Sequence, residues 1–95
     1  MATININPES FNNDQYPRNL ARIACEIMAL WKKPSMDAQP YLNAMLHIHS
    51  TSPDAEYYAE DAQTIVMYFL ANAQGFRGAD ARRIKQELKQ QYNIK

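Results

Sequence analysis

The sequence is poor in the residues that build disulfide-stabilised, β-rich or membrane-spanning proteins. Its 95 residues include one cysteine and only two glycines. A single cysteine cannot form an internal disulfide, and an all-β fold needs more tight turns than two glycines favour. The longest apolar stretch, residues 65–71, is far shorter than the ~20 residues of a membrane-spanning helix. Residues 1–11 lack any Lys or Arg and any apolar run, so they do not resemble a secretory signal. We therefore expect a cytoplasmic protein with no membrane contact.

The chain has no net charge, but its charges are unevenly distributed. Ten basic and ten acidic residues cancel overall. Residues 77–95 hold six basic and two acidic residues, a local charge of +4, and residues 1–76 carry the opposite charge of −4. Such asymmetry is typical of an anion-binding end. It is equally compatible with a basic helix that docks on its own acidic body.

The apolar pattern predicts four helices in one domain. Residues recur at three- and four-residue spacing over about 17–33, 38–49, 53–73 and 79–92. Pro17 and Pro53 suit first turns, and the third helix is expected to be central, with Met67 and Tyr68 widening its buried face. We predict an all-α fold, a compact four-helix bundle or orthogonal helical array. A short N-terminal arm (1–16) precedes a single helical domain (17–95).

Individual residues of these helices also carry expectations. In the first helix, Leu30 belongs to the apolar stripe and Cys25 lies beside it, where a small buried or half-buried thiol is more plausible than a nucleophile. Arg22 and Glu26 stand four apart and suit a weak surface ion pair. In the last helix, Ala81, Ile84, Leu88 and Tyr92 are expected to point inward.

The C-terminal quarter has the outline of a helix-turn-helix, two helices joined by a short glycine-containing turn. Its basic residues could contact phosphates, since Arg and Lys supply many contacts to a nucleic-acid backbone. The candidate anion or nucleic-acid contacts are Arg77, Arg82, Arg83, Lys85 and Lys89. The simpler interpretation, which we favour, is a helical hairpin with a solvated basic face.

Tyrosine is abundant for so short a chain, with six residues. Tyr and Trp are enriched at protein interfaces because they combine a large apolar area with a polar tip. The adjacent Tyr57 and Tyr58 diverge by about 100° on a helix, so they cannot both be buried easily. They are the candidate interface residues, and tyrosines that merely cover core edges are the equal alternative.

No set of residues predicts a metal site, a cofactor or a catalytic centre. His47 and His49 point about 200° apart on a helix and cannot easily hold one metal ion. Glu56, Glu60 and Asp61 suit solvated charges at a helix N-terminus better than an acid–base pair. No phosphate-binding loop or nucleophile elbow is present.

The stretch from Tyr68 to Gln90, YFLANAQGFRGADARRIKQELKQ, resembles short uncharacterised helical proteins of bacteria and phages. This resemblance implies a helical fold and brings no functional residues. The leading hypothesis is a non-enzymatic helical protein-interaction or regulatory module, whose partner is another protein or a second copy in a dimer. Nucleic-acid binding through the C-terminal hairpin is the alternative.

Overall fold

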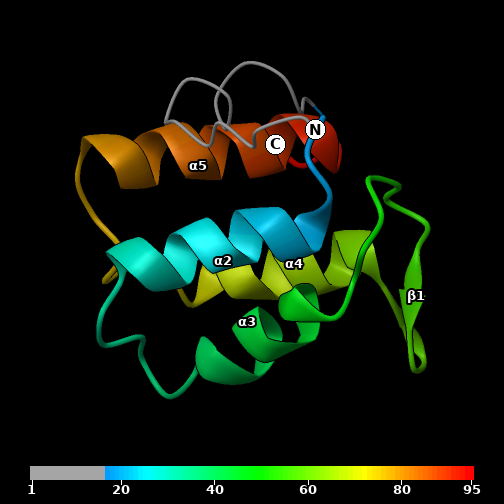
Figure 1. The fold of residues 1–95 in the computed structure, drawn as a ribbon, viewed down its shortest axis with the longest axis horizontal. Coiled ribbons are helices and arrows are strands. Elements are labelled where there is room, and N and C mark those ends of the chain that lie inside the picture. Colours follow the sequence, from blue (N-terminus) through cyan, green and yellow to red (C-terminus); the bar gives the residue numbers. More distant parts are fainter. Residues whose placement is uncertain (1–16) are drawn as a thin grey trace, which may run out of the picture.

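The computed structural model describes residues 17–95, which form four helices and one short β-hairpin (Figure 1). The elements are α2 (Leu20–Leu30), α3 (Gln39–Leu46), β1 (Glu56–Tyr57), β2 (Glu60–Asp61), α4 (Ala62–Ala71) and α5 (Ala79–Gln91). The mostly helical architecture is as predicted, but the strands are not, so the all-α class is only partly right. The predicted N-terminal arm lies outside the described residues.

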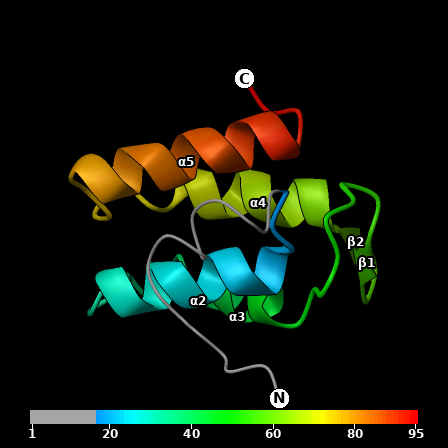
Figure 2. The ribbon, with the colours of Figure 1, turned by 45° about the horizontal axis from the view of Figure 1, so that its top comes forward.

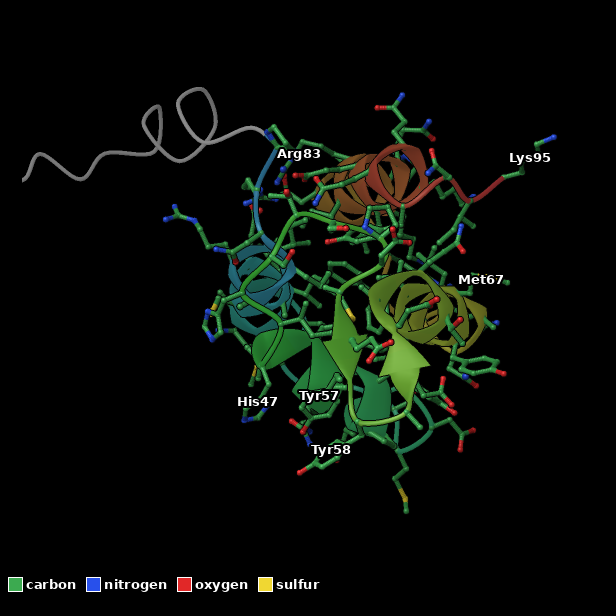
Figure 3. All side chains as sticks on the ribbon, turned by 90° about the vertical axis from the view of Figure 1, so that its right-hand side faces the viewer. His47, Tyr57, Tyr58, Met67, Arg83 and Lys95 are labelled. Atoms are coloured by element: carbon green, nitrogen blue, oxygen red, sulfur yellow. The ribbon has the colours of Figure 1, made fainter. Side chains whose placement is uncertain are left out.

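The axes of α2, α4 and α5 are nearly parallel. α2 and α4 run in one direction and α5 runs in the other (Figures 1 and 2). Looking along the long axis, Figure 3 shows all three nearly end-on. α3 contacts both α2 and α4, and α5 contacts α2. The arrangement is therefore a small helical cluster with a hairpin at one end.

All four helices contribute to one core. Its fully buried side chains include Leu20, Ile23, Ile27, Met45, Val66, Phe69, Ile84, Leu88 and Tyr92. The Trp31 ring stacks on Phe76 at a centroid distance of 5.5 Å and meets the Phe69 ring edge-on at 6.3 Å. A Cβ on Gly75 would lie 3.5 Å from the Trp31 ring, so the α4–α5 connection passes close to it. The predicted inward face of α5, from Ala81 to Tyr92, is confirmed.

The predicted start of the first helix is wrong by about one turn. α2 begins after Asn19, whose Oδ1 accepts a hydrogen bond from the Arg22 N–H at 2.9 Å. This is ordinary N-cap chemistry, and it leaves Pro17 outside the helix. Two further expectations for this helix fail, because Leu30 is 41% exposed and Cys25 is exposed as well. Leu30 lies on the flank of a buried face centred on Leu20 and Ile27, and Cys25 lies on the opposite side of the helix.

The second helix ends earlier than predicted because its last residues serve α2. The Ile48 carbonyl accepts a hydrogen bond from the Ala21 N–H at 2.9 Å, and the Ser50 carbonyl accepts one from Leu20 at 3.0 Å. The first N–H groups of a helix lack partners within it, so these carbonyls satisfy donors that would otherwise be buried and unpaired. α3 therefore stops at Leu46 rather than at His49.

The predicted third helix is wrong over its first two turns, where the hairpin of β1 and β2 stands instead. Asp61 caps α4, its Oδ1 accepting from the Thr64 N–H at 2.9 Å. The predicted start at Ser52 and Pro53 is a turn, with the Ser52 hydroxyl accepting from the Asp54 N–H at 3.1 Å. Short polar side chains favour both caps and turns, so Ser-Pro-Asp does not distinguish them.

The prediction that Met67 and Tyr68 widen the buried face of the third helix is also wrong. Met67 is 48% exposed and Tyr68 is 46% exposed. Tyr68 packs against Tyr41 of α3 at a centroid distance of 5.4 Å, but no element covers the outer side of α4 at these positions within residues 17–95.

A buried arginine joins the start of α2 to α5. Arg18 is 3% exposed and forms a two-pronged ion pair with Glu87, with distances of 2.9 and 2.7 Å to its two carboxylate oxygens. Arg18 Nη1 also lies 2.8 Å from Glu26 Oε1. Burial alone would lower the pKa of Arg18, but the hydrogen bonds and charges of Glu87 and Glu26 outweigh it and raise the pKa. The guanidinium therefore stays charged in the interior.

The ion network continues to the outer side of α5. Glu26, which we expected to pair with Arg22, pairs with Arg18 and with Arg83, whose Nη2 lies 2.7 Å from Glu26 Oε2. Arg83 also contacts Asp80 at 3.3 Å. Charges from residue 18, α2 and α5 thus alternate in sign across one helix interface.

We expect Arg18→Ala to lower the free energy of unfolding by about 3–5 kcal/mol, because removing one partner leaves Glu87 nearly buried and unpaired. Urea-induced unfolding followed by circular dichroism measures the loss. Arg82→Ala, at an exposed position of α5, is the matched control and should change stability by no more than about 0.5 kcal/mol. Equal stabilities of the two variants would show that the Arg18 network does not hold α5.

Glu26 is expected to make the protein sensitive to acid. Burial alone raises the pKa of Glu26, but hydrogen bonds from Arg83 and Arg18 and their charges lower it below its ordinary value of 4.5. Such a carboxylate contributes stability that is complete above the unfolded-state pKa and is lost as the pH falls through the folded-state pKa. Glu26→Gln should therefore be less stable than the wild type at neutral pH and should approach it below pH 4.5. Unfolding curves at a series of pH values check this, and a constant difference between the two proteins would contradict it.

Candidate interaction surfaces

Three aromatic side chains gather at the hairpin end of the molecule. The Tyr57 ring stacks on His47 of the α3 C-terminus at 5.7 Å, and the Tyr58 ring meets Tyr57 edge-on at 4.7 Å. Figure 3 shows the three labelled side chains next to one another. We call His47, Tyr57 and Tyr58 the aromatic hairpin. Tyr57 is half-buried, His47 is exposed, and Tyr58 is 86% exposed.

Tyr58 has an unfavourable backbone conformation. Tyr57 pairs with Glu60, so Tyr58 and Ala59 form the two-residue loop of the hairpin. Tyr58 has a φ of 60°, in the left-handed region that glycine usually occupies at this loop position. A bulky residue there is an outlier, and such outliers cluster at functional sites. A large apolar side chain is thus both strained and exposed.

Acidic residues surround the aromatic hairpin. Asp54, Glu56 and Glu60 are exposed, and none of them forms an ion pair within residues 17–95. Asp61 is occupied as the α4 N-cap, and the hydrogen bond from the Thr64 backbone lowers its pKa. Of the three carboxylates predicted to be solvated, Glu56 and Glu60 are exposed and flank a hairpin, whereas Asp61 is half-buried and caps α4.

The five predicted basic contacts fall into two groups. Arg83 is bound to Glu26, and Lys85 Nζ lies 2.8 Å from the Ala73 carbonyl oxygen, to which it donates. The other three, Arg77, Arg82 and Lys89, form no ion pair within the described part of the chain. Part of the basic helix thus docks on the protein itself, as one of the two interpretations of the charge asymmetry expected.

Arg77 and Lys85 lie near the α4–α5 connection, and Lys89 follows one turn after Lys85, in the last turn of α5. Burial lowers the pKa of Lys85, and the positive charges of Lys89 and Arg77 lower it further. Lys85 also lies over the Phe76 ring, 5.8 Å from its centroid. We call Arg77, Lys85 and Lys89 the basic patch. Its positive charge is concentrated by side chains from both the connection and α5.

The C-terminal hairpin does not have the geometry of a DNA-binding helix-turn-helix. Residues 72–78 connect α4 to α5, and the two helices run antiparallel (Figure 2). A helix-turn-helix joins its helices at ≈ 90–120° through a turn of three or four residues. Gly78, with a φ of 109°, is the glycine that the connection requires, whereas Gly75 provides the close approach to Trp31.

The remaining candidate residues do not form a metal site or a membrane span. Residues 17–95 contain no group of three or more His, Cys, Asp or Glu side chains arranged to hold a metal ion. His47 Nδ1 lies 2.9 Å from the Asn43 carbonyl oxygen of its own helix. Within the same residues, no helix combines the length and the apolar character needed to cross a bilayer.

Comparison with models of protein families, with curated protein sequences and with solved structures finds no significant match.

Sequence reasoning missed His47 as a partner of Tyr57, and it missed Arg18 entirely. His47 and Tyr57 stand ten positions apart, so their contact leaves no helical or strand periodicity in the sequence. An arginine just before a helix has the same sequence pattern as a solvated charge. The Tyr57-Tyr58 pair was found, although for the wrong local structure.

The strain at Tyr58 gives a measurable difference between two substitutions. Tyr58→Gly should be more stable than Tyr58→Ala by about 1 kcal/mol, because glycine adopts a left-handed φ without steric cost. Both variants lose the contact with Tyr57, so the difference isolates the backbone, and thermal unfolding measures it. Ala59→Gly, at the neighbouring position without a positive φ, should bring no gain. Equal stability of the two Tyr58 variants would argue against a left-handed loop.

Proposed function

We propose that this chain is a non-enzymatic protein-interaction module whose contact surface is the aromatic hairpin. The observation that carries the proposal is Tyr58, a tyrosine that is 86% exposed and has a φ of 60°. Energetically dominant residues of interfaces are often Tyr, Trp or Arg side chains that become desolvated in the complex. A tyrosine side chain has few rotatable bonds, so it loses little conformational freedom on binding.

The surroundings of Tyr58 support the same function. Tyr57 stacks on His47, so the hairpin packs against the α3 C-terminus. The α4 N-terminus holds it from the other side, because the Ala55 carbonyl accepts from Ala62 at 2.7 Å and the Pro53 carbonyl from Gln63 at 3.1 Å. A surface on a well-held element offers one shape to a partner.

The nucleic-acid hypothesis has less support. Arg83 and Lys85 are engaged within the protein, and the antiparallel α4–α5 pair gives no recognition helix of the usual kind. The basic patch remains a cationic surface, and its preference for nucleic acid or protein is one of the outcomes tested below.

Site-specific photocrosslinking tests the proposed function. A benzophenone-bearing phenylalanine analogue at position 58, in the cells that produce the protein, should yield a discrete covalent adduct with a partner. Met36, which is 84% exposed on the α2–α3 connection, is the matched control position. An adduct at position 58 that is absent at position 36 supports the hairpin as the contact surface. The same adducts at both positions, or none at position 58, would refute it.

A further inference from the structure

Two surfaces of opposite charge form no ion pair within residues 17–95, although Arg77 Nε donates to the Gln74 carbonyl at 3.2 Å and Lys85 to the Ala73 carbonyl. The aromatic hairpin offers an exposed tyrosine among three exposed carboxylates, those of Asp54, Glu56 and Glu60. The basic patch offers Arg77, which is exposed, and Lys89, which is half-buried, beside Lys85. Carboxylates bind guanidinium and ammonium groups, and arginine also stacks on tyrosine rings. Each surface therefore has the chemistry that the other would bind.

Within one molecule, the part of the basic patch on the α4–α5 connection lies at the other end of α4 from the aromatic hairpin. β2 leads directly into α4, so the hairpin lies at the α4 N-terminus, and the connection that carries Arg77 begins at its C-terminus. The ten residues of α4 span about 15 Å at 1.5 Å per residue. Lys85 donates to the Ala73 carbonyl just beyond that far end. Figure 1 shows the hairpin and the α4–α5 connection at opposite sides of the view.

We propose that the partner of the aromatic hairpin is a second copy of this chain, which docks its basic patch there head to tail. Arg77 of one copy would lie against the Tyr58 ring of the next, and Lys89 would face Glu56 and Glu60. This inference rests on the proposed function, because it takes the same hairpin as the contact surface. The contact uses two different surfaces of the same molecule, so it repeats from copy to copy and does not close at a dimer unless the rotation happens to bring the ends together.

The chemistry predicts a weak and salt-dependent assembly. Exposed ion pairs each contribute about 0–1 kcal/mol, and a cation–π contact at an exposed site about 0.5–1 kcal/mol. Their range shrinks from a Debye length of about 30 Å at 0.01 M salt to about 3 Å at 1 M. Association should therefore appear at high protein concentration in low salt and disappear in high salt.

Two variants each remove one surface without touching the core. The hairpin variant carries Glu56→Gln, Tyr58→Gly and Glu60→Gln, all at exposed positions. The patch variant carries Arg77→Gln and Lys89→Gln, and it keeps Lys85 because that side chain holds the Ala73 carbonyl. Lys32→Gln with Lys33→Gln is the matched control, since it removes two exposed positive charges elsewhere.

Sedimentation equilibrium over a range of concentrations measures the assembly. In low salt the wild type and the lysine control should grow in average mass with concentration, and each surface variant alone should stay monomeric. An equimolar mixture of the two variants retains one intact patch and one intact hairpin, so it should form particles that stop at a dimer. Recovery in the mixture distinguishes a head-to-tail contact from a symmetric one.

Several results would overturn this inference. They are a wild type that stays monomeric in low salt, a mixture that does not recover association, and a lysine control that is as impaired as the patch variant. Titration of labelled duplex DNA and single-stranded RNA adds one more. Salt-sensitive binding that is lost in the patch variant, with no self-association of the wild type, would assign the patch to nucleic acid instead.

Failure of self-association does not by itself refute the proposed function. If the wild type is monomeric but the crosslinker at position 58 captures a different protein, the hairpin is an interaction surface with another partner. If the crosslinker captures this same chain at Arg77 or in α5, both conclusions stand together.

Discussion

The buried guanidinium of Arg18 is the interaction on which the helical arrangement depends. α5 is a helix of low apolar content that offers few large side chains to the core, mainly Ile84 and Leu88. Its position is therefore fixed by charge as well as by packing, because Glu87 is bound by Arg18 on one side of the helix. A buried charge must be matched in geometry as well as in sign, so this pair specifies one placement of α5.

The same region contains a second set of directed bonds. Gln91 donates to the Arg18 carbonyl at 2.6 Å, and Gln63 donates to the Tyr92 carbonyl at 2.9 Å. Asn93, with a φ of 59°, ends the helix, and the Ile94 N–H returns to the Lys89 carbonyl at 2.8 Å. This pattern is a Schellman motif, which satisfies carbonyls that a helix end leaves open. The end of α5 is held by polar contacts around the buried Tyr92 ring.

The placement of α5 determines which charges remain for partners. Arg83 forms an ion pair with Glu26, and Lys85 donates a hydrogen bond to the Ala73 carbonyl of the connection that precedes α5. Of the positive charges left on the surface, Arg77 lies on the connection at the far end of α4 from the aromatic hairpin, and Lys89 lies in the last turn of α5. Some basic residues thus hold the fold together, and others stay on the surface. The proposed contact between copies depends on those that stay on the surface.

The sequence by itself determined the helices whose apolar residues recur at helical spacing. α5 is nearly as predicted, because Ala81, Ile84 and Leu88 mark its buried face and Gly78 marks its start. The middle of α2 and most of α3 were found for the same reason. Local periodicity suffices for such features because each depends on residues a few positions apart.

Only the tertiary structure decided the helix ends, the hairpin and the ion network. Residues 47–50 leave their helix because the N–H groups of Leu20 and Ala21 need their carbonyls. Residues 53–61 become a hairpin because Asp61 caps α4 and Tyr57 packs on His47. Arg18 is buried because Glu87, far along the chain, lies opposite it. Each outcome depends on a partner distant in sequence, whose position exists only once the chain has folded.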